Sequence, residues 1–176
     1  MLLSFSGTGI FLILIFASLF ITAMKNRKTN SNPVSSKLYY ILGSLQTFTA
    51  IGAIPAGIGY LMDTSGKGMG ASTELLANSP LNSFLLPGLF LLLVNGLAHI
   101  VGAYLSFTRN RYVGHAGLIL GILLTLWIII QVAWISLLSV LQPLFLLIGL
   151  INTYLSWKIL KITTVTSDFN GTYEKI

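Results

Sequence analysis

Two polar residues, Asn95 and His99, lie four positions apart inside the apolar stretch 84–108. On a helix, residues at i and i+4 project from one face. A polar side chain at mid-bilayer depth is expected to face the interior of a helical bundle and to have a partner there. The pair is therefore a structural hydrogen-bonding pair, a ligand-contacting or proton-handling pair, or part of a metal site. No second histidine or acid lies at ligand spacing, which argues against the metal site.

A second candidate face combines aromatic and amide side chains. Trp127, Gln131 and Trp134 follow one another at i, i+4 and i+7, so they share one side of a helix. Aromatic residues at this spacing usually face lipid or core, but such a face can also line an apolar pocket with one polar anchor. Interhelical hydrogen bonding is the simpler explanation for Gln46. The sequence gives a hypothetical ligand-binding set and no catalytic residue, metal ligand or cofactor; the set is Gln46, Asn95, His99, Trp127 and Gln131.

The composition places these residues in a membrane protein. Of 176 residues, 55% are hydrophobic and only 8% are charged, whereas soluble domains have about 25% charged residues. The mean hydropathy is +0.86. The absence of cysteine excludes disulfides and thiolate metal sites. We expect one integral membrane domain without a soluble catalytic domain.

Five apolar stretches are long enough to cross about 30 Å of hydrocarbon as helices. Backbone groups in lipid must be satisfied internally, and these stretches are too long and too uniform for barrel strands. The sequence therefore predicts an all-α, polytopic transmembrane helical bundle, with one N-terminal span added to a four-helix core. The predicted spans are residues 4–24, 38–62, 84–108, 116–135 and 141–160.

The basic residues predict an orientation in the cell membrane. Lys67 is the one cation on the predicted outside, and nine cations lie on the predicted cytoplasmic side. This bias follows the positive-inside rule and predicts an outside N-terminus and a cytoplasmic C-terminus. The net charge of +6 does not indicate nucleic acid as a partner, because the polar segments are too short for a binding module. The nine cations are Lys25, Arg27, Lys28, Lys37, Arg109, Arg111, Lys158, Lys161 and Lys175.

The polar segment 63–83 is rich in glycine but fits neither common phosphate-binding pattern. Its two acids, Asp63 and Glu74, are too far apart to define acid–base chemistry. Residues 72–77 are compatible with one helical turn. The pair Ser79 and Pro80 predicts an N-cap and first position of the next helix. After residue 161 we expect a mobile polar tail.

One part of the sequence resembles a loop of small bacterial membrane proteins. It consists of the segments DTSGKGMG and LANSPLNSFLLPGL and the following apolar span, which contains a few polar residues. The general layout is similar to the broad DoxX-like group. This resemblance covers residues 38–160 and leaves the first span as an addition. It implies a compact bundle of four core helices, and no catalytic residue is carried over from it.

Three classes of function remain. The first is a non-enzymatic subunit or assembly partner of a membrane complex, joined to a protein partner or to copies of itself through small-residue helix faces. The second is a binder or carrier of a small apolar or lipid-like molecule in a cavity between spans two, three and four. An enzyme is less favoured, because no nucleophile, acid pair or metal cluster has a recognisable spacing. The small-residue faces are Gly52 with Ala56, Ala53 with Gly57, and Gly117 with Gly121.

Overall fold

The computed structural model describes residues 33–173, with side chains from 36 to 163. The part of the chain that it describes is helical and contains no strand. Four of its helical segments are long and apolar enough to cross a membrane: Ser36–Met62, Leu85–Phe107, Val113–Ile135 and Leu141–Thr163. They match the four predicted core spans. The predicted first span, residues 4–24, lies outside the described residues.

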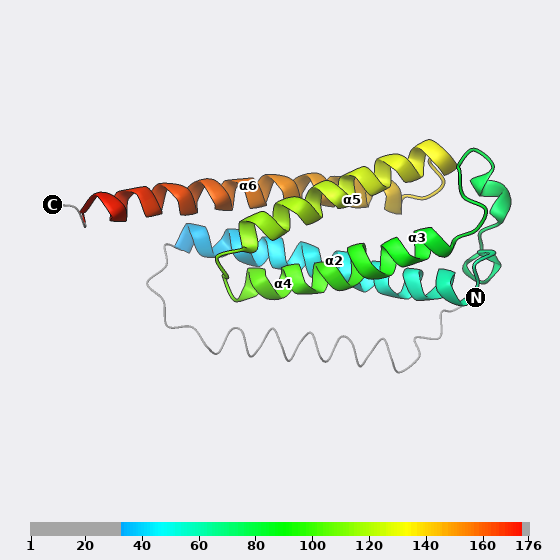
Figure 1. Ribbon diagram of the computed structural model, residues 1–176, viewed down its shortest axis with the longest axis horizontal. Coiled ribbons are helices and arrows are strands. Elements are labelled where there is room, and N and C mark those ends of the chain that lie inside the picture. The colour runs from blue at the N-terminus through cyan, green and yellow to red at the C-terminus, as the bar shows by residue number, and fades with distance from the viewer. Residues whose placement is uncertain (1–32, 174–176) are drawn as a thin grey trace.

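The four segments run antiparallel to their neighbours in the chain, as Figure 1 shows. The second segment is one rod with a π-helical centre. We call α3, η3 and α4 together the composite rod. Helix α5 packs along α6, and α2 packs along both the composite rod and α6. The elements are α2 (Pro33–Met62), α3 (Leu85–Phe90), the π-helix η3 (Leu91–Ala98), α4 (His99–Phe107), α5 (Val113–Ile135) and α6 (Leu141–Tyr173).

The weakest side of the bundle lies between α5 and the rod formed by α3, η3 and α4. The two are close where the short connection 108–112 joins them, and they diverge toward α3 (Figure 1). This divergence opens a space between α5 and one flank of α3 and η3, which α5 still contacts through the stacked rings of Phe90 and Trp127. A groove forms there and is described below.

Glycines set the tight contact between α5 and α6. A Cβ atom on Gly121 would lie 2.6 Å from the backbone nitrogen of Thr153, and one on Gly149 would lie 2.6 Å from Thr125 Oγ1. Gly117 faces Ser156 in the same way. Small residues let helix backbones approach closely in lipid, where van der Waals packing drives association. The Gly117–Gly121 pair is thus used within the chain.

Two buried apolar clusters lie inside the bundle. The first joins the beginnings of α2 and α5 to the last membrane-spanning turns of α6, and the second joins α5 to the first half of α6. Their buried members are Leu38, Leu42, Val113, Leu155 and Ile159 in the first cluster, and Leu124, Ile128 and Ile148 in the second.

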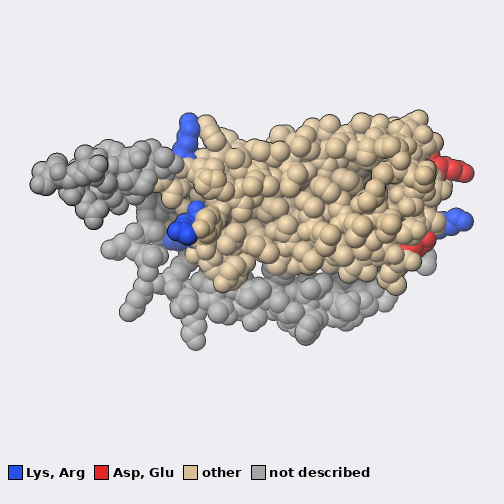
Figure 2. Space-filling model, viewed as in Figure 1, with Lys and Arg blue, Asp and Glu red and all other residues tan. Residues whose placement is uncertain are grey.

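Charged side chains separate to the two ends of the bundle (Figure 2). The "loop end" carries Asp63, Lys67 and Glu74 in the segment between α2 and α3. The opposite "basic end" carries cations from α2, the 108–112 connection and α6, namely Lys37, Arg109, Arg111, Lys158 and Lys161. The apolar helices between them have the length of a membrane crossing.

The structure corrects two predicted helix boundaries and extends the last helix. The helix after the loop begins at Leu85 rather than at Pro80. Ser79 Oγ donates to Leu76 O and accepts from Leu81 N, so it stabilises a turn instead of capping a helix. The polar tail is helical where the structure describes it, because α6 continues to Tyr173. The fourth span begins at Val113, three residues earlier than predicted.

The helical turn predicted within residues 72–77 is confirmed as the 3-10 helix η2 (Thr73–Leu76), with Ser72 accepting from Glu74 N at its start. The loop folds back on the helices around it. Phe84 N donates to Thr64 O, and the Phe84 ring stacks on Tyr60 with ring centroids 4.8 Å apart. This packing fixes where α3 starts.

Candidate functional site

Seven buried polar side chains occupy the interior of the bundle, and we call them the "polar interior". They come from three of the four membrane-spanning segments: α2, the composite rod and α6. Each is at most 1% exposed. The seven are Gln46, Thr49, Asn95, His99, Ser106, Asn152 and Ser156.

Helix periodicity explains why the polar interior is continuous. On the composite rod, Asn95, His99 and Ser106 are spaced by four and seven residues, so they follow one stripe along the helix. On α6, Asn152 and Ser156 are spaced by four. Each stripe faces inward because the alternative is a polar group in hydrocarbon, which costs free energy.

Contacts between helices place parts of these stripes at the same depth. Ser106 Oγ donates to Gln46 Oε1 over 2.9 Å. At Gly102, one turn from Ser106, a Cβ atom would lie 2.9 Å from Gln46 Nε2. Gly117 of α5 faces both Leu42 and Ser156. The polar interior therefore begins beside the apolar cluster at the basic end and extends toward the loop end.

His99 is held by the backbone of its own helix. Its Nδ1 lies 3.1 Å from the carbonyl oxygen of Val94. A carbonyl only accepts hydrogen bonds, so this contact requires the proton on Nδ1. In the neutral ring, Nε2 is then an acceptor directed into the bundle, with the His99 side chain fully buried.

Several atoms of the polar interior are buried and have no hydrogen-bond partner among the residues that the structure describes. We call these the "open polar atoms". Buried polar groups in proteins are nearly always paired, so each such atom marks a place where a further group is expected. They are Gln46 Nε2, Asn95 Nδ2 and Oδ1, His99 Nε2, Asn152 Nδ2 and Oδ1, and Ser156 Oγ.

The π-helix η3 positions Asn95 and His99 relative to the rest of the rod. It spans Leu91–Ala98, so Asn95 lies within it and His99 directly follows it. The wider turn shifts the register between α3 and α4. Segments of this kind are frequent at functional sites because they re-aim side chains locally.

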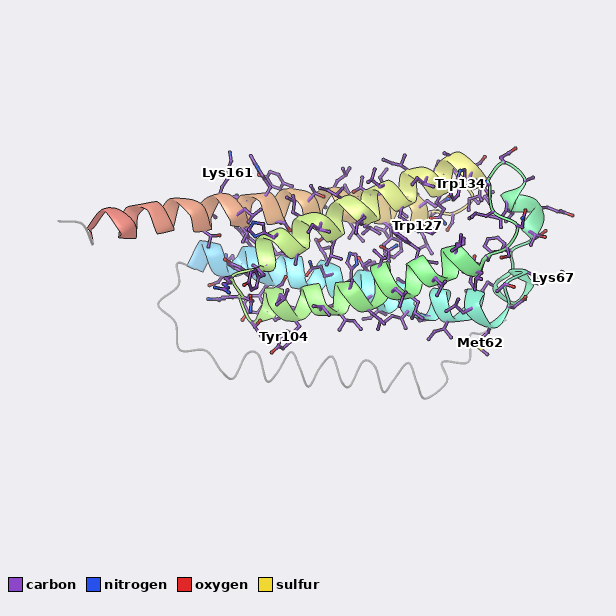
Figure 3. The ribbon with its side chains drawn as sticks, viewed as in Figure 1. Met62, Lys67, Tyr104, Trp127, Trp134 and Lys161 are labelled. Carbon is purple, nitrogen blue, oxygen red and sulfur yellow. The ribbon has the colours of Figure 1, made fainter. Side chains whose placement is uncertain are left out.

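An apolar groove of about 360 Å³ lies between the composite rod and α5, where the two diverge. In Figure 3 both tryptophans of α5 lie in the half nearer the loop end, with Trp134 closer to the loop. The volume is within the range of small-molecule sites. The groove is lined by Leu81, Leu86, Pro87, Leu89, Phe90, Leu93, Val94, Trp127 and Trp134.

The groove and the polar interior meet at η3. Val94 lines the groove, and its carbonyl accepts the hydrogen bond from His99. The rings of Phe90 and Trp127 stack with centroids 4.5 Å apart. Trp127 also packs against the second apolar cluster. This stacked pair therefore lies where the wall of the groove joins the bundle core.

The structure divides the predicted ligand-binding residues between two places. Gln46, Asn95 and His99 belong to the polar interior, and Trp127 lines the groove. Gln131 is half-buried and belongs to neither set.

Sequence reasoning missed Ser106, Asn152 and Ser156. The i, i+4 spacing of Asn152 and Ser156 within an apolar span was the available signal. It is the same spacing that singled out Asn95 and His99.

The chemistry of this interior is hydrogen bonding without formal charge. Within residues 36–163, no group of three or more His, Cys, Asp or Glu side chains is placed to hold a metal ion. His99 is the one titratable member of the polar interior. Amide, hydroxyl and imidazole groups of this kind orient a ligand and select its polar atoms.

Comparison of the chain with protein-family models, curated proteins and solved structures finds no match. The resemblance to the DoxX-like group therefore stays a prediction.

Proposed function

We propose that this protein is a multi-pass membrane protein that binds a lipid-like molecule in the groove between α3–η3 and α5. The observation that supports the proposal is the lining of the groove, where all nine residues are apolar and three are aromatic. Apart from the indole N–H groups of the two tryptophans, the side chains of this surface offer no hydrogen bonds to a polar ligand. It instead offers dispersion contacts to an apolar chain.

The position of the groove supports an apolar chain as its occupant. It lies along a helix of membrane-spanning length, so the surrounding medium is hydrocarbon. Between Leu86 and Val94 the helix rises by about 12 Å. A chain lying along this length would contact Trp134 and Trp127 in turn. Rigid aromatic walls order a flexible chain with little loss of their own side-chain entropy.

The proposed orientation places the basic end in the cytoplasm and the loop end outside, following the positive-inside rule. The groove then opens in the outer half of the membrane, because its lining reaches from Leu81 near the loop to Val94. The proposed ligand would enter sideways from the outer leaflet. Cysteine labelling at Lys67→Cys and Lys158→Cys in intact cells tests this orientation. Labelling of position 158 by an impermeant reagent would contradict it.

Site-specific photo-crosslinking of the full-length protein in its native membrane tests the binding function. A benzophenone side chain replaces Leu93, which lines the groove and is 51% exposed. The matched control replaces Val101, which is 57% exposed on the same rod and outside the groove. We expect mass spectrometry to find one enriched lipid-like adduct at position 93 and only bulk phospholipid at position 101.

Three outcomes would contradict this function. The same bulk phospholipid at both positions would show that the groove selects nothing. An adduct with another protein at position 93 would make the groove a subunit interface. An adduct with residues 4–24 of the same chain would show that the predicted first span covers it.

A second candidate function is a non-enzymatic subunit of a membrane complex. It is favoured by α6, whose residues 164–173 extend the helix by about 15 Å past its membrane-spanning part (Figure 1). Gly52 and Ala56 of α2 also remain at least partly exposed for a helical partner or a second copy. Native mass spectrometry after gentle solubilisation tests it. A stoichiometric partner chain would support the subunit function, and a monomer carrying a small molecule would support ligand binding in the groove.

A further inference from the structure

We propose that the turn between α5 and α6, residues 136–140, is embedded in the lipid leaflet at the loop end, with its apolar side chains in contact with acyl chains. We call this turn the "hairpin tip". The inference concerns a surface other than the groove and does not depend on a ligand there. It follows from the composition of the tip, the hydrogen bonding of its backbone and its depth relative to α2.

The hairpin tip carries no charge and exposes its apolar side chains. Leu137 is 64% exposed, Leu138 is 58% exposed and Val140 is 84% exposed. The sequence contains no Lys, Arg, Asp or Glu from residue 112 to residue 157. The polar loop 63–83, at the same end of the bundle, has three charged residues. Transfer of the exposed apolar surface of the tip from water to acyl chains is therefore favourable, and no charge opposes it.

One buried side chain satisfies much of the backbone of the hairpin tip. Gln142 is 4% exposed, and its Oε1 accepts from Leu138 N over 2.8 Å and from Ser139 N over 3.1 Å. Its Nε2 donates to Ser136 O over 3.0 Å. Ser139 accepts from Leu141 N through its hydroxyl and from Gln142 N through its carbonyl. Irregular backbone at membrane depth is tolerated where its polar groups have such partners, whereas water would satisfy an exposed turn without them.

Two further donors indicate that the hairpin tip lies near the membrane boundary and not at its centre. Among the described residues, Leu137 N and Val140 N have no hydrogen-bond acceptor. Unpaired backbone groups are costly in hydrocarbon. The ester carbonyls and water at the base of the lipid headgroups are acceptors for them.

The start of α6 lies deeper in the membrane than the end of α2. At the basic end the two helices begin at a common depth, because Leu38 of α2 and Ile159 of α6 belong to one apolar cluster. From there α6 extends about 27 Å to Leu141, and α2 extends about 36 Å to Met62. The hydrocarbon core is about 30 Å thick. The first turn of α6 therefore stays inside it, while α2 reaches past it (Figure 1).

A second contact gives the same difference. A Cβ atom on Gly52 of α2 would lie 3.1 Å from Cζ of the Phe145 ring of α6. Beyond this contact, α2 continues for about 15 Å to Met62, and α6 continues for about 6 Å to Leu141. By this measure too, α6 begins about 9 Å short of the end of α2.

The hairpin tip therefore descends into the membrane on its way from α5 to α6. Val113 belongs to the same apolar cluster, and from it α5 extends about 33 Å to Ile135. The chain then returns over the five residues of the tip to Leu141. Val140, which directly precedes Leu141, is the deepest residue of the tip and also its most exposed.

The apolar surface of the hairpin tip continues along α6. Leu141, Leu144 and Leu147 follow one another at intervals of three residues and are 58%, 39% and 55% exposed. Residues three apart are neighbours on a helix surface. Close packing of helices in membranes favours small residues, and this surface has leucine and valine instead. It therefore fits acyl chains better than a second copy of the chain.

Spin labelling of the full-length protein in phosphatidylcholine vesicles tests the depth of the hairpin tip. The sequence contains no cysteine, so each variant carries a single label. The test variant is Val140→Cys. The references are Leu147→Cys, in the membrane-spanning part of α6, and Lys67→Cys, in the polar loop. Oxygen concentrates in hydrocarbon and a nickel chelate stays in water. We expect oxygen to relax the label at position 140 more strongly than the nickel chelate does, as at position 147, and the order to reverse at position 67.

Two outcomes would overturn the inference. A stronger effect of the nickel chelate at position 140 would place the hairpin tip in water. Protection of position 140 from both reagents would show that protein covers the tip, such as a second copy of the chain. If Val140→Cys does not fold, Leu137→Cys takes its place, with the same expected order and the same contrary outcomes. Neither measurement involves the groove, whose function is tested separately by crosslinking at Leu93.

Discussion

Ser106 Oγ and Gln46 Oε1 form a 2.9 Å hydrogen bond that joins α4 to α2 inside the bundle, and both side chains are fully buried. Ser106→Ala would remove this donor and leave a buried amide oxygen unpaired. We expect the free energy of unfolding to fall by about 1–2 kcal/mol, the range of such bonds in membranes and of unpaired buried groups. Unfolding by titration with sodium dodecyl sulfate measures the change.

The control for this bond is Ser44→Ala, which removes an exposed hydroxyl from α2, the helix that carries Gln46. It should leave the free energy of unfolding within about 0.5 kcal/mol of the unmodified protein. Equal losses in the two variants would show that the buried bond does not stabilise the contact between α4 and α2.

Gly121 allows α5 and α6 to approach at backbone distance. In Gly121→Ala the new methyl would lie 2.6 Å from Thr153 N and 3.0 Å from Gly149 O, so the two helices must separate. We expect a loss of about 1–3 kcal/mol in the free energy of unfolding. The comparison is Gly52→Ala, where the nearest atom is the end of the Phe145 ring at 3.1 Å. A loss at Gly52 that equals the loss at Gly121 would contradict the proposed role of close backbone packing.

The four-helix core was predictable because the signals are local. Apolar runs of membrane-spanning length define the four helices, and the charges that separate them gather at two ends of the bundle. The start of α3 was not predictable from Ser79 and Pro80. Ser79 forms the hydrogen bonds of a turn and not those of a helix cap. The helix begins only at Leu85, after Phe84 has stacked on Tyr60 and donated a hydrogen bond to Thr64.

The polar interior was predictable in part. The spacing of Asn95 and His99 predicts one shared face, and both residues are buried. Their neighbours across the bundle, such as Ser156 of α6, depend on which helices pack together. That arrangement depends on glycine contacts such as Gly117 against Ser156, which periodicity within one span does not encode. The groove depends on the divergence of α5 from α3, which is also a property of packing.

Asp63 should order the first part of the loop in a pH-dependent way. The hydroxyl of Ser65 donates to its carboxylate over 2.6 Å and the amide of Gly68 donates over 2.7 Å. These bonds, with that of Ser65 foremost, hold the pKa of Asp63 below its ordinary value of 3.8. The contribution to folding is therefore fully present above pH 3.8 and is lost as the pH falls through the lower, folded-state pKa.

We expect slow amide exchange at Gly68 between pH 7 and 5, after correction for intrinsic rates, and loss of that protection as the pH falls through the lowered, folded-state pKa of Asp63. Asp63→Asn should lose the protection at every pH, because one oxygen acceptor becomes a donor. Glu74→Gln, at an exposed position of the same loop, is the control and should keep the pH dependence of the Gly68 protection. If the exchange protection of the Gly68 amide does not change with pH in the unmodified protein, the proposed role of the Asp63 carboxylate is wrong.

Asn95 and Asn152 should both be replaceable by leucine without loss of stability. Each is buried, and both amide atoms of each are open polar atoms. Leucine is larger than asparagine but has the same number and branching of side-chain heavy atoms, and it has no polar group to satisfy. The ligand-free variants should therefore be as stable as the unmodified protein, or more stable by about 1–3 kcal/mol. Unfolding in dodecyl sulfate measures this. Destabilisation of both variants by more than about 2 kcal/mol would show that the amides are structural hydrogen-bonding groups.

Trp127 and Trp134 line the same groove but should differ in their effect on stability. Trp127 stacks on Phe90 and packs on the second apolar cluster, while Trp134 lies nearer the loop end (Figure 3). Trp127→Leu loses an aromatic pair, about 0.5–1.5 kcal/mol, together with part of its buried area. We expect Trp134→Leu to change the free energy of unfolding by less than half as much.

Both variants should lower the yield of the lipid-like adduct at the benzophenone of position 93, because each removes one aromatic wall of the groove. The control is Trp157→Leu, at an exposed site near the basic end, which should leave the adduct yield unchanged. If Trp127→Leu lowers the free energy of unfolding and leaves the adduct yield unchanged, the stacked pair of Phe90 and Trp127 belongs to the core alone and does not contribute to binding in the groove.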